Sequence, residues 1–436
     1  MGVRRRPGVW LACATLLTAA VVAAEVAGQR GGAFRASRDH PAIRYSDGPV
    51  DDAVAALNRR LAAGEAGLAF EGRSGYLQSV LDALGVPVAS QVAVFSPTSN
   101  QDDLITPENP RAIFFNDTVA VGWVRDADLL EVAAQDPRQG VIFYALPQTP
   151  DGEPRFTRND RCLACHLSWD TLGVPGLQVL SMAPLSPDPN AYATGFVTDH
   201  RSRLVDRWGG WYVTGTHGGT AHMGNVEVLD VPDPNATFGV VPPALDSLAE
   251  RIDLDGYPSP YSDVVALLVL DHQTHMTNLI TRMGWEARRV VFRDEGRSTD
   301  DPRFAEVIRE AAVELVDYLL FIDEAPLPEG IGGASGFREW FSARGPHDDR
   351  GRSLRKISLD GRLFRYPCSY MIYTEAFDAL PELAKEAVYA RMWEVLSGAV
   401  TDSPYDRLAL ADRQAIVEIL QATKQDLPAY FGTVER

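Results

Sequence analysis

The sequence predicts an α+β fold with an antiparallel, β-rich N-terminal part, a loop-rich middle segment and a mainly helical C-terminal part. Short apolar runs separated by tight turns occupy 92–144, which leaves no room for the crossover helices of a parallel sheet. Residues 150–245 are rich in Gly, Pro, Asp and His, and apolar stripes at helical spacing follow from about 260 onward. No Pro- or Ser-rich linker separates these parts, so we expect 29–149, 150–245 and 246–436 to pack as one body.

The N-terminal end has the pattern of a secretory signal peptide. Arg4, Arg5 and Arg6 precede an apolar run over 9–24, and small residues suited to cleavage follow. The run is short for a membrane span, so we expect 1–28 to be cleaved, with retention as an anchor as the alternative. The mature chain is then expected in a bacterial periplasm or outside the cell, without a stable membrane span.

The composition is that of an acidic globular protein. Hydrophobic residues make up 45% of the 436, which is enough apolar surface to offset the entropy lost on folding. The formal net charge is −18, and loss of 1–28 makes it more negative. Nucleic-acid binding relies on clustered Lys and Arg, so this balance argues against a nucleic-acid partner. Four Cys in a chain of this length exclude a disulfide scaffold.

The N-terminal part is expected to start with two short helices and to continue as strands. One apolar stripe at helical spacing follows two Asp residues and ends at Gly64, and a second covers 76–84 and ends at Gly85. Asn116-Asp117 marks a turn between two strands. The expected strands are 92–94, 112–115, 119–124, 141–144 and, in the middle segment, 208–213.

Four helices are expected in the C-terminal part. Pro260 suits the first position of a helix that follows Ser259, and its apolar stripe runs to Gly284. A second helix is expected to begin at Asp301-Pro302, with Val307, Ile308, Ala311, Leu315 and Leu319 on its apolar face. The third helix is expected from Pro381 to Gly398, and the fourth over about 411–424.

One motif carries specific chemistry: Cys162-Leu-Ala-Cys165-His166 is a Cys-x-x-Cys-His sequence. Two thiols at this spacing can add to both vinyl groups of a haem, and the adjacent His can bind its iron. A redox-active Cys pair is an alternative, but no βαβ pattern surrounds the motif. Half of a zinc site is another alternative, for which His217 and His222 offer a second pair.

The motif resembles the haem-attachment site of c-type cytochromes. The longer runs 114–182, 208–225 and 364–381 are similar to a family of large secreted bacterial cytochrome c-like proteins with a single haem, for which no reaction is known. This resemblance implies one covalent haem c, held through Cys162 and Cys165, with His166 as the proximal iron ligand. In small electron-carrying cytochromes c the motif lies near the mature N-terminus, whereas here a long N-terminal part precedes it.

The ligand on the opposite, distal side of the iron is open at this stage. Cytochromes c use Met or His there, so the candidates are Met182, His217 and His222 with the neighbouring Met223, and His272 with the neighbouring His275. Met182 is equally a core residue, because Met fills irregular gaps. His217 and His222 also suit a Gly-rich surface turn. His272 lies on an apolar helical stripe, where a hydrogen-bonded core His is the alternative.

Two functions follow from the two states of the distal position. With a sixth ligand, the protein is expected to transfer electrons outside the cytoplasm, to or from a redox partner whose surface is basic. With an open position, it is expected to be a haem-dependent enzyme of the peroxidase or oxidase type, in which a distal His acts as the acid–base partner and a nearby Arg stabilises charge. Arg201, Arg203 and Arg207 are the candidates for that Arg, and a solvated charged stretch is the alternative for them. A haem-anchored binding protein is a third, non-catalytic alternative.

Cys368 has no partner and is expected to be a buried, inert thiol.

Overall fold

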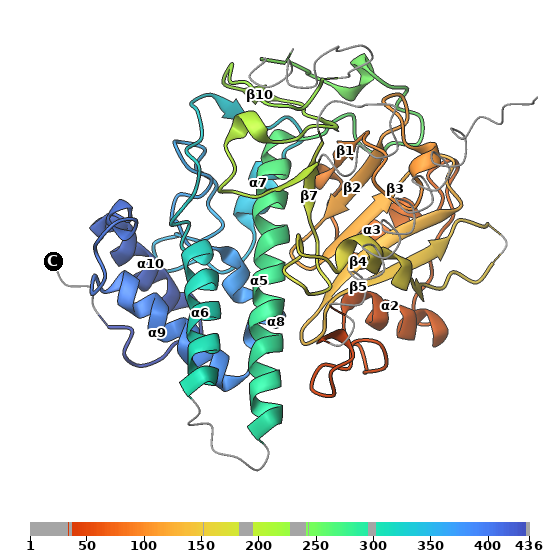
Figure 1. Ribbon diagram of the computed structural model, residues 1–436. Helices are drawn as coiled ribbons and strands as arrows, with labels where there is room; N and C mark the ends of the chain where they lie inside the picture. Colours follow the sequence, from red (N-terminus) through yellow and green to blue (C-terminus); the bar gives the residue numbers. More distant parts are fainter. Residues whose placement is uncertain are drawn as a thin grey trace, which may run out of the picture.

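The structure, a computed structural model, describes residues 34, 37–150, 152–182, 195–226, 241–242, 244–294 and 302–432. The expected signal peptide, 1–28, lies outside these residues. Within them the chain has the expected α+β architecture, with an antiparallel seven-stranded sheet and a mainly helical C-terminal part (Figure 1). No helix in this part of the chain combines the length and the apolar character that a bilayer span requires.

The sheet has the strand order β6-β5-β4-β3-β2-β1-β9, and every neighbouring pair is antiparallel. Its two edge strands, β6 and β9, come from the middle segment of the chain, 150–245. This segment therefore shares one sheet with the N-terminal part. The strands are β1 (Val92–Val94), β2 (Arg111–Phe115), β3 (Val119–Trp123), β4 (Leu129–Asp136), β5 (Gly140–Pro147), β6 (Thr157–Arg158) and β9 (Trp211–Tyr212).

Most of the expected strands are confirmed, but β4 was missed. Its sequence LLEVAAQD is buried at nearly every position, so it lacks the polar alternation that marks a half-exposed strand. The strand expected over 208–213 is reduced to the two residues of β9. Trp208 and Gly210 have φ of 70° and 82°, so the backbone before β9 turns instead of pairing.

Helices α2 (Ala53–Ala62) and α3 (Leu77–Leu84) cover one face of the sheet, as their apolar stripes predict. The Asp52 carboxylate accepts hydrogen bonds from the N–H groups of Val54 and Ala55 and so caps α2. Gly85, with φ of 64°, ends α3 in the left-handed conformation that glycine adopts without strain.

The other face of the sheet packs against α5 (Val264–Asp294), a 31-residue helix that lies between the sheet and the last helices of the chain (Figure 1). The expected start at Pro260 is wrong: the Asp263 carboxylate accepts from the N–H groups of Val265 and Ala266 and caps the helix there. The expected end at Gly284 is also wrong. A single helical Gly costs only about 1 kcal/mol, and the buried neighbours Met283 and Trp285 pack well enough to carry the helix on.

The other three expected C-terminal helices are close to expectation, but two short helices, over Phe337–Ala343 and Glu375–Asp378, were not predicted. Val307 is the exception on the predicted apolar face of α6, because its side chain is exposed while the other four are buried. The helices are α6 (Pro302–Leu319), α7 (Phe337–Ala343), α8 (Glu375–Asp378), α9 (Glu382–Leu396) and α10 (Leu410–Thr423).

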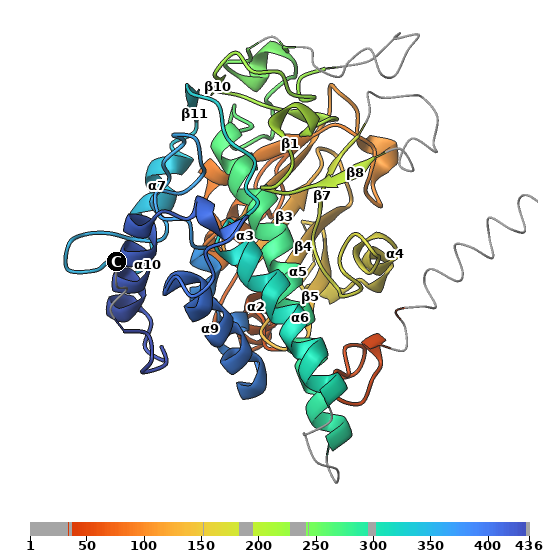
Figure 2. The same cartoon turned by 60° about the vertical axis from the view of Figure 1, so that its left-hand side comes forward.

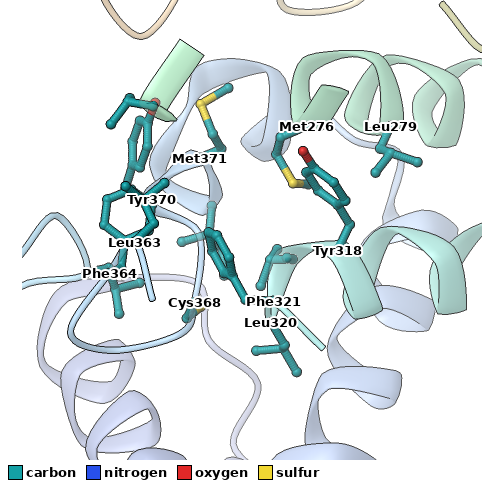
Figure 3. Close-up of a cluster of buried hydrophobic side chains, with 14 of the residues drawn as sticks. Met276, Leu279, Tyr318, Leu320, Phe321, Leu363, Phe364, Cys368, Tyr370 and Met371 are labelled. Atoms are coloured by element: carbon teal, nitrogen blue, oxygen red, sulfur yellow. The ribbon is translucent and has the colours of Figure 1, made fainter. Parts of the chain in front are cut away.

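Cys368 lies in the core between α5, α6 and the C-terminal loops, in a cluster that includes Phe321 and Phe364 (Figure 3). Its side chain is fully buried, and burial raises the pKa of the thiol far above its ordinary value. The expectation that Cys368 is buried is confirmed. Its inertness, which follows from a thiol that burial keeps protonated, stays a prediction.

Candidate functional site

A cavity lies on the α5-facing side of the sheet, and its floor follows from the strand register. Gly122 pairs with Ile113 on one side and with Glu131 on the other. In the next row, Ala133 pairs with Ala120 and with Phe143. Because side chains alternate across a strand, these residues share one face of the sheet. The side chains of Ala120 and Ala133 are small, so they leave space above this part of the sheet.

This space, the motif cavity, has a volume of about 310 Å³, at the lower end of the range for small-molecule sites. Its roof comes from the Cys-x-x-Cys-His motif and from α5, and its rim from the loop that follows β1. Beyond the floor, to which Arg111 also belongs, the lining includes Pro97, Thr98, Ser99, Asn100, Asp102, Arg161, Cys162, Cys165, His166, Leu177, Gln178, Trp211, Leu270 and Thr274.

The motif itself forms a short helical turn at the cavity. Cys162 ends a 3₁₀ turn, Asp160–Cys162, and the helix α4 (Leu163–His166) follows directly. Figure 2 shows α4 on the side of the molecule remote from α9 and α10. The three residues predicted to hold a haem, Cys162, Cys165 and His166, all line the motif cavity, and both thiols are free.

His166 has a defined orientation and tautomer. Its Nδ1–H donates to the carbonyl oxygen of Gly176 at 2.9 Å, and its ring lies against Phe143 with centroids 4.9 Å apart. Burial lowers the pKa of His166 to about 4, so the imidazole is neutral at pH 7. With the proton on Nδ1, Nε2 carries a lone pair, which is the state that metal-binding His residues adopt.

The environment of Cys162 disagrees with a redox dithiol. Burial raises the pKa of its thiol to about 11, and the charge of Glu131 adds to the rise. Redox-active Cys-x-x-Cys pairs need the opposite, a depressed thiol pKa. The Asn100 amide nitrogen lies 3.8 Å from the Cys162 sulfur. The thiol of Cys162 is therefore kept in the protonated state.

The zinc alternative finds no second ligand pair at this place. His217 and His222 do not line the motif cavity, although their rings are 4.8 Å apart. Among the residues that the structure describes, no group of three or more His, Cys, Asp or Glu is arranged to hold a metal ion.

Arg111 and Glu131 form an ion pair in the cavity floor that the sequence did not predict. Arg111 Nη2 lies 2.7 Å from Glu131 Oε2, and the side chains are 22% and 11% exposed. The guanidinium crosses Gly122, where a Cβ atom would come within 2.3 Å of it. Glycine at this position therefore lets an Arg of β2 reach a Glu of β4 across the intervening strand.

Met182 lies outside the lining of the motif cavity. It is buried, and its N–H donates to the Gly209 carbonyl at 2.9 Å. Met223 packs nearby, with its sulfur 3.6 Å from the Ser181 hydroxyl. Both methionines behave as core residues, which was the alternative for Met182.

His217 and His222 lie in the Gly-rich turn region, away from the motif cavity. A Cβ on Gly215 or Gly218 would come within 2.4 Å of the Gly332 carbonyl or 2.0 Å of the Glu329 carbonyl. These glycines thus allow β10 (Thr216–His217) to approach β11 (Ile331–Gly332), a backbone segment and not a macrocycle.

His222 is buried next to that turn. Its Nδ1 accepts from the Gly224 N–H at 3.0 Å, and burial, with a smaller contribution from His217, lowers its pKa to about 3. His217 Nδ1 donates to the Thr220 carbonyl at 3.0 Å. Each ring therefore has a local backbone partner, as a structural His does.

His272 and His275 belong to a buried network on α5, as the core alternative predicted. His272 Nδ1 lies 2.8 Å from His200 Nδ1, and His272 Nε2 lies 2.7 Å from the Ser369 hydroxyl. Arg201 donates to His275 Nε2 at 3.1 Å. Burial lowers the pKa of His272 to about 3 and that of His275 to about 4. His200, which has no assigned role in the sequence, is thus a fully packed member of the core.

Of the three Arg residues that precede Trp208, Arg201 pairs with Asp199 and lies outside the motif cavity, and the other two differ from one another. Arg203 is exposed beside Asp206, as a solvated stretch predicts. Arg207 is buried and pairs with the buried Asp271 at 3.3 Å. Neither Arg203 nor Arg207 lines the motif cavity.

Within the described lining of the motif cavity, His166 is thus the one His, and no Met accompanies it. The distal candidates from the sequence lie elsewhere, while Arg111 and Glu131 lie in the floor. No protein-family model, no curated protein and no solved structure matches this chain.

Proposed function

We propose that this chain is a c-type haem protein that exchanges single electrons outside the cytoplasm. The observation that carries the proposal is the arrangement of Cys162, Cys165 and His166 on one cavity, with His166 held through Nδ1 so that Nε2 is left for a metal. A haem supplies an iron that cycles between two oxidation states; the protein supplies the axial ligand and the burial that set its potential.

The residues present fit such a group. The thiols of Cys162 and Cys165 are both free, so both are available to add to vinyl groups. Ala120 and Ala133 give the floor small side chains beside the Arg111 guanidinium, which covers Gly122. Cys162 and Cys165 would attach the haem, and His166 would be its proximal ligand.

Two further expectations belong to this proposal. Haem attachment of this kind takes place outside the cytoplasm, so a periplasmic or secreted location accompanies it. The strongly acidic net charge of −18 suits a redox partner with a basic surface, because complementary charge accelerates encounter.

Haem staining of the denatured protein tests the proposal. The chain is expressed with the haem-attachment machinery and run on a denaturing gel, where only covalent haem remains. The wild type is expected to stain, and Cys162→Ala with Cys165→Ala is expected not to. Cys368→Ala is the matched control: it also removes a Cys, but one outside the motif cavity, and should stain as the wild type does. An unstained wild type refutes the proposal.

An enzyme with an open distal position is the second candidate. Its support is that no described His or Met besides His166 lines the motif cavity, whereas the Arg111–Glu131 pair does. If a haem is bound here, Arg111 would stabilise negative charge and Glu131 would be the group that can transfer a proton. A holoprotein spectrum that shifts when cyanide or carbon monoxide is added supports the enzyme. A spectrum that ignores both ligands supports the electron carrier.

A further inference from the structure

His166 and Gly176 are joined by two hydrogen bonds that close a ring. The His166 Nδ1–H donates to the Gly176 carbonyl at 2.9 Å, and the Gly176 N–H donates to the His166 carbonyl at 3.0 Å. The orientation of the imidazole therefore depends on where the chain around Gly176 is held.

That chain is held from both sides. From the sheet, the Val141 N–H donates to the Pro175 carbonyl at 3.0 Å. From α5, the Asn278 side chain makes two bonds with Leu177: its Oδ1 accepts from the Leu177 N–H at 2.9 Å, and its Nδ2 donates to the Leu177 carbonyl at 2.7 Å. Asn278 is itself 1% exposed, so these bonds are shielded from competing water.

Gly176 is shaped to the Asn278 amide. A Cβ on Gly176 would lie 2.1 Å from Asn278 Oδ1 and 2.7 Å from its Cγ. Asn278 follows Leu270 and Thr274 at intervals of four residues, so it continues the stripe of α5 that lines the motif cavity. The Asn278 amide thus lies beside the Gly176 carbonyl, which accepts the hydrogen bond from the His166 Nδ1–H.

We propose that Asn278 is a positioning residue for His166: it fixes the Gly176 carbonyl, and through it the tautomer and direction of the imidazole. The proposal rests on the haem function for its role in the holoprotein, but its geometry belongs to the polypeptide alone. Outer partners that accept the free N–H of a ligating His fix its ring and raise its basicity. A more basic ligand favours ferric iron, so the clamp should lower the reduction potential.

The first test reads His166 directly in the full chain expressed without haem-attachment machinery. Nitrogen-15 NMR of labelled histidines distinguishes the two tautomers, with His166→Gln used to assign the signal. The wild type is expected to show His166 with its proton on Nδ1. In Asn278→Ala, a mixture of both tautomers is expected. An unchanged Nδ1 tautomer in Asn278→Ala overturns the proposal whether or not the protein binds haem.

The second test uses the holoprotein. Asn278→Ala should still stain for covalent haem, because Cys162 and Cys165 are untouched. Its reduction potential should rise. Equal potentials in the two proteins refute the role. Absence of stain in the wild type refutes the haem function instead, and leaves the NMR result to decide on Asn278.

Asn58 provides a matched control, because it makes the same pair of bonds elsewhere. Its Nδ2 donates to the Phe156 carbonyl at 2.8 Å, and its Oδ1 accepts from the Phe156 N–H at 3.0 Å. Asn58→Ala should lower stability without moving the His166 tautomer or the potential. Asn278→Asp keeps the acceptor for the Leu177 N–H and loses the donor, so its tautomer ratio should lie between those of wild type and Asn278→Ala. Equal effects of Asn58→Ala and Asn278→Ala on the potential would contradict a specific role.

Discussion

Replacement of Glu131 tests whether the Arg111–Glu131 ion pair in the motif cavity is shielded from solvent and stabilises the fold. Glu131→Ala leaves the Arg111 guanidinium without its carboxylate in a floor of Ile113, Ala120 and Ala133. Removal of one partner costs about 3–5 kcal/mol for a fully buried pair and about 0.2–1 kcal/mol for an exposed one. Arg111 is 22% exposed and Glu131 is 11% exposed. We therefore expect an intermediate loss of about 2 kcal/mol, or about thirtyfold in the folded-to-unfolded ratio.

Urea unfolding followed by tryptophan fluorescence measures this loss. A double-mutant cycle with Arg111→Leu isolates the pair, and a coupling energy of about 1–2 kcal/mol is expected. Glu306→Ala is the matched control, because it breaks an Arg–Glu pair with Arg309 whose side chains are 53% and 62% exposed. The reasoning is refuted if Glu131→Ala costs no more than Glu306→Ala and the coupling energy is zero.

Three other predictions concern pH, thiol chemistry and backbone strain. Burial lowers the pKa of His222 and His272 to about 3, so the unfolded chain takes up protons at a higher pH than the folded chain does. The stability of the fold should therefore fall as the pH drops from about 6.5 toward 3. A urea unfolding midpoint that is the same at about pH 7.5 and about pH 4.5 contradicts this. In the variant that lacks both motif cysteines, a thiol reagent should label Cys368 only after unfolding, because burial keeps this thiol protonated and inaccessible. Mass spectrometry measures the labelling, and rapid labelling of the native protein would contradict the prediction. Gly218 and Gly219 have φ of 64° and 67°, but only Gly218 faces a carbonyl. Gly219→Ala should therefore cost about 1–2 kcal/mol and Gly218→Ala clearly more in urea unfolding, and equal losses would contradict the close approach of Glu329.

The parts of the fold that follow local rules could be predicted from the sequence. The Asp cap before α2 and the Gly after α3 mark their helices within a few residues of chain. The start of α5 was misplaced because Pro260 is a strong local signal, while Asp263 also accepts from Ala334 and Ser335, about seventy residues away. Strand β4 was missed because both of its faces are buried, which removes the period of two.

The candidate site divides in the same way. The sequence predicts Cys162, Cys165 and His166 because all three belong to one motif of five consecutive residues. Arg111 and Glu131 meet only through the register of three strands, and no local pattern reports that register.

Asn278 was missed for a related reason. It stands about a hundred positions from Leu177 on a helix whose packing the sequence does not reveal. His200 was also missed, because a His in a polar loop gives no sign that tertiary packing buries it against His272.

The intact mass of the denatured, mature protein, expressed with haem-attachment machinery, tests the central claim most directly. Two thioether bonds at Cys162 and Cys165 survive denaturation, so the measured mass should equal that of the polypeptide plus one haem. The double Cys162→Ala and Cys165→Ala variant should have the mass of its polypeptide alone. A wild-type mass equal to the bare polypeptide, under conditions in which a known c-type cytochrome is loaded, would contradict the account.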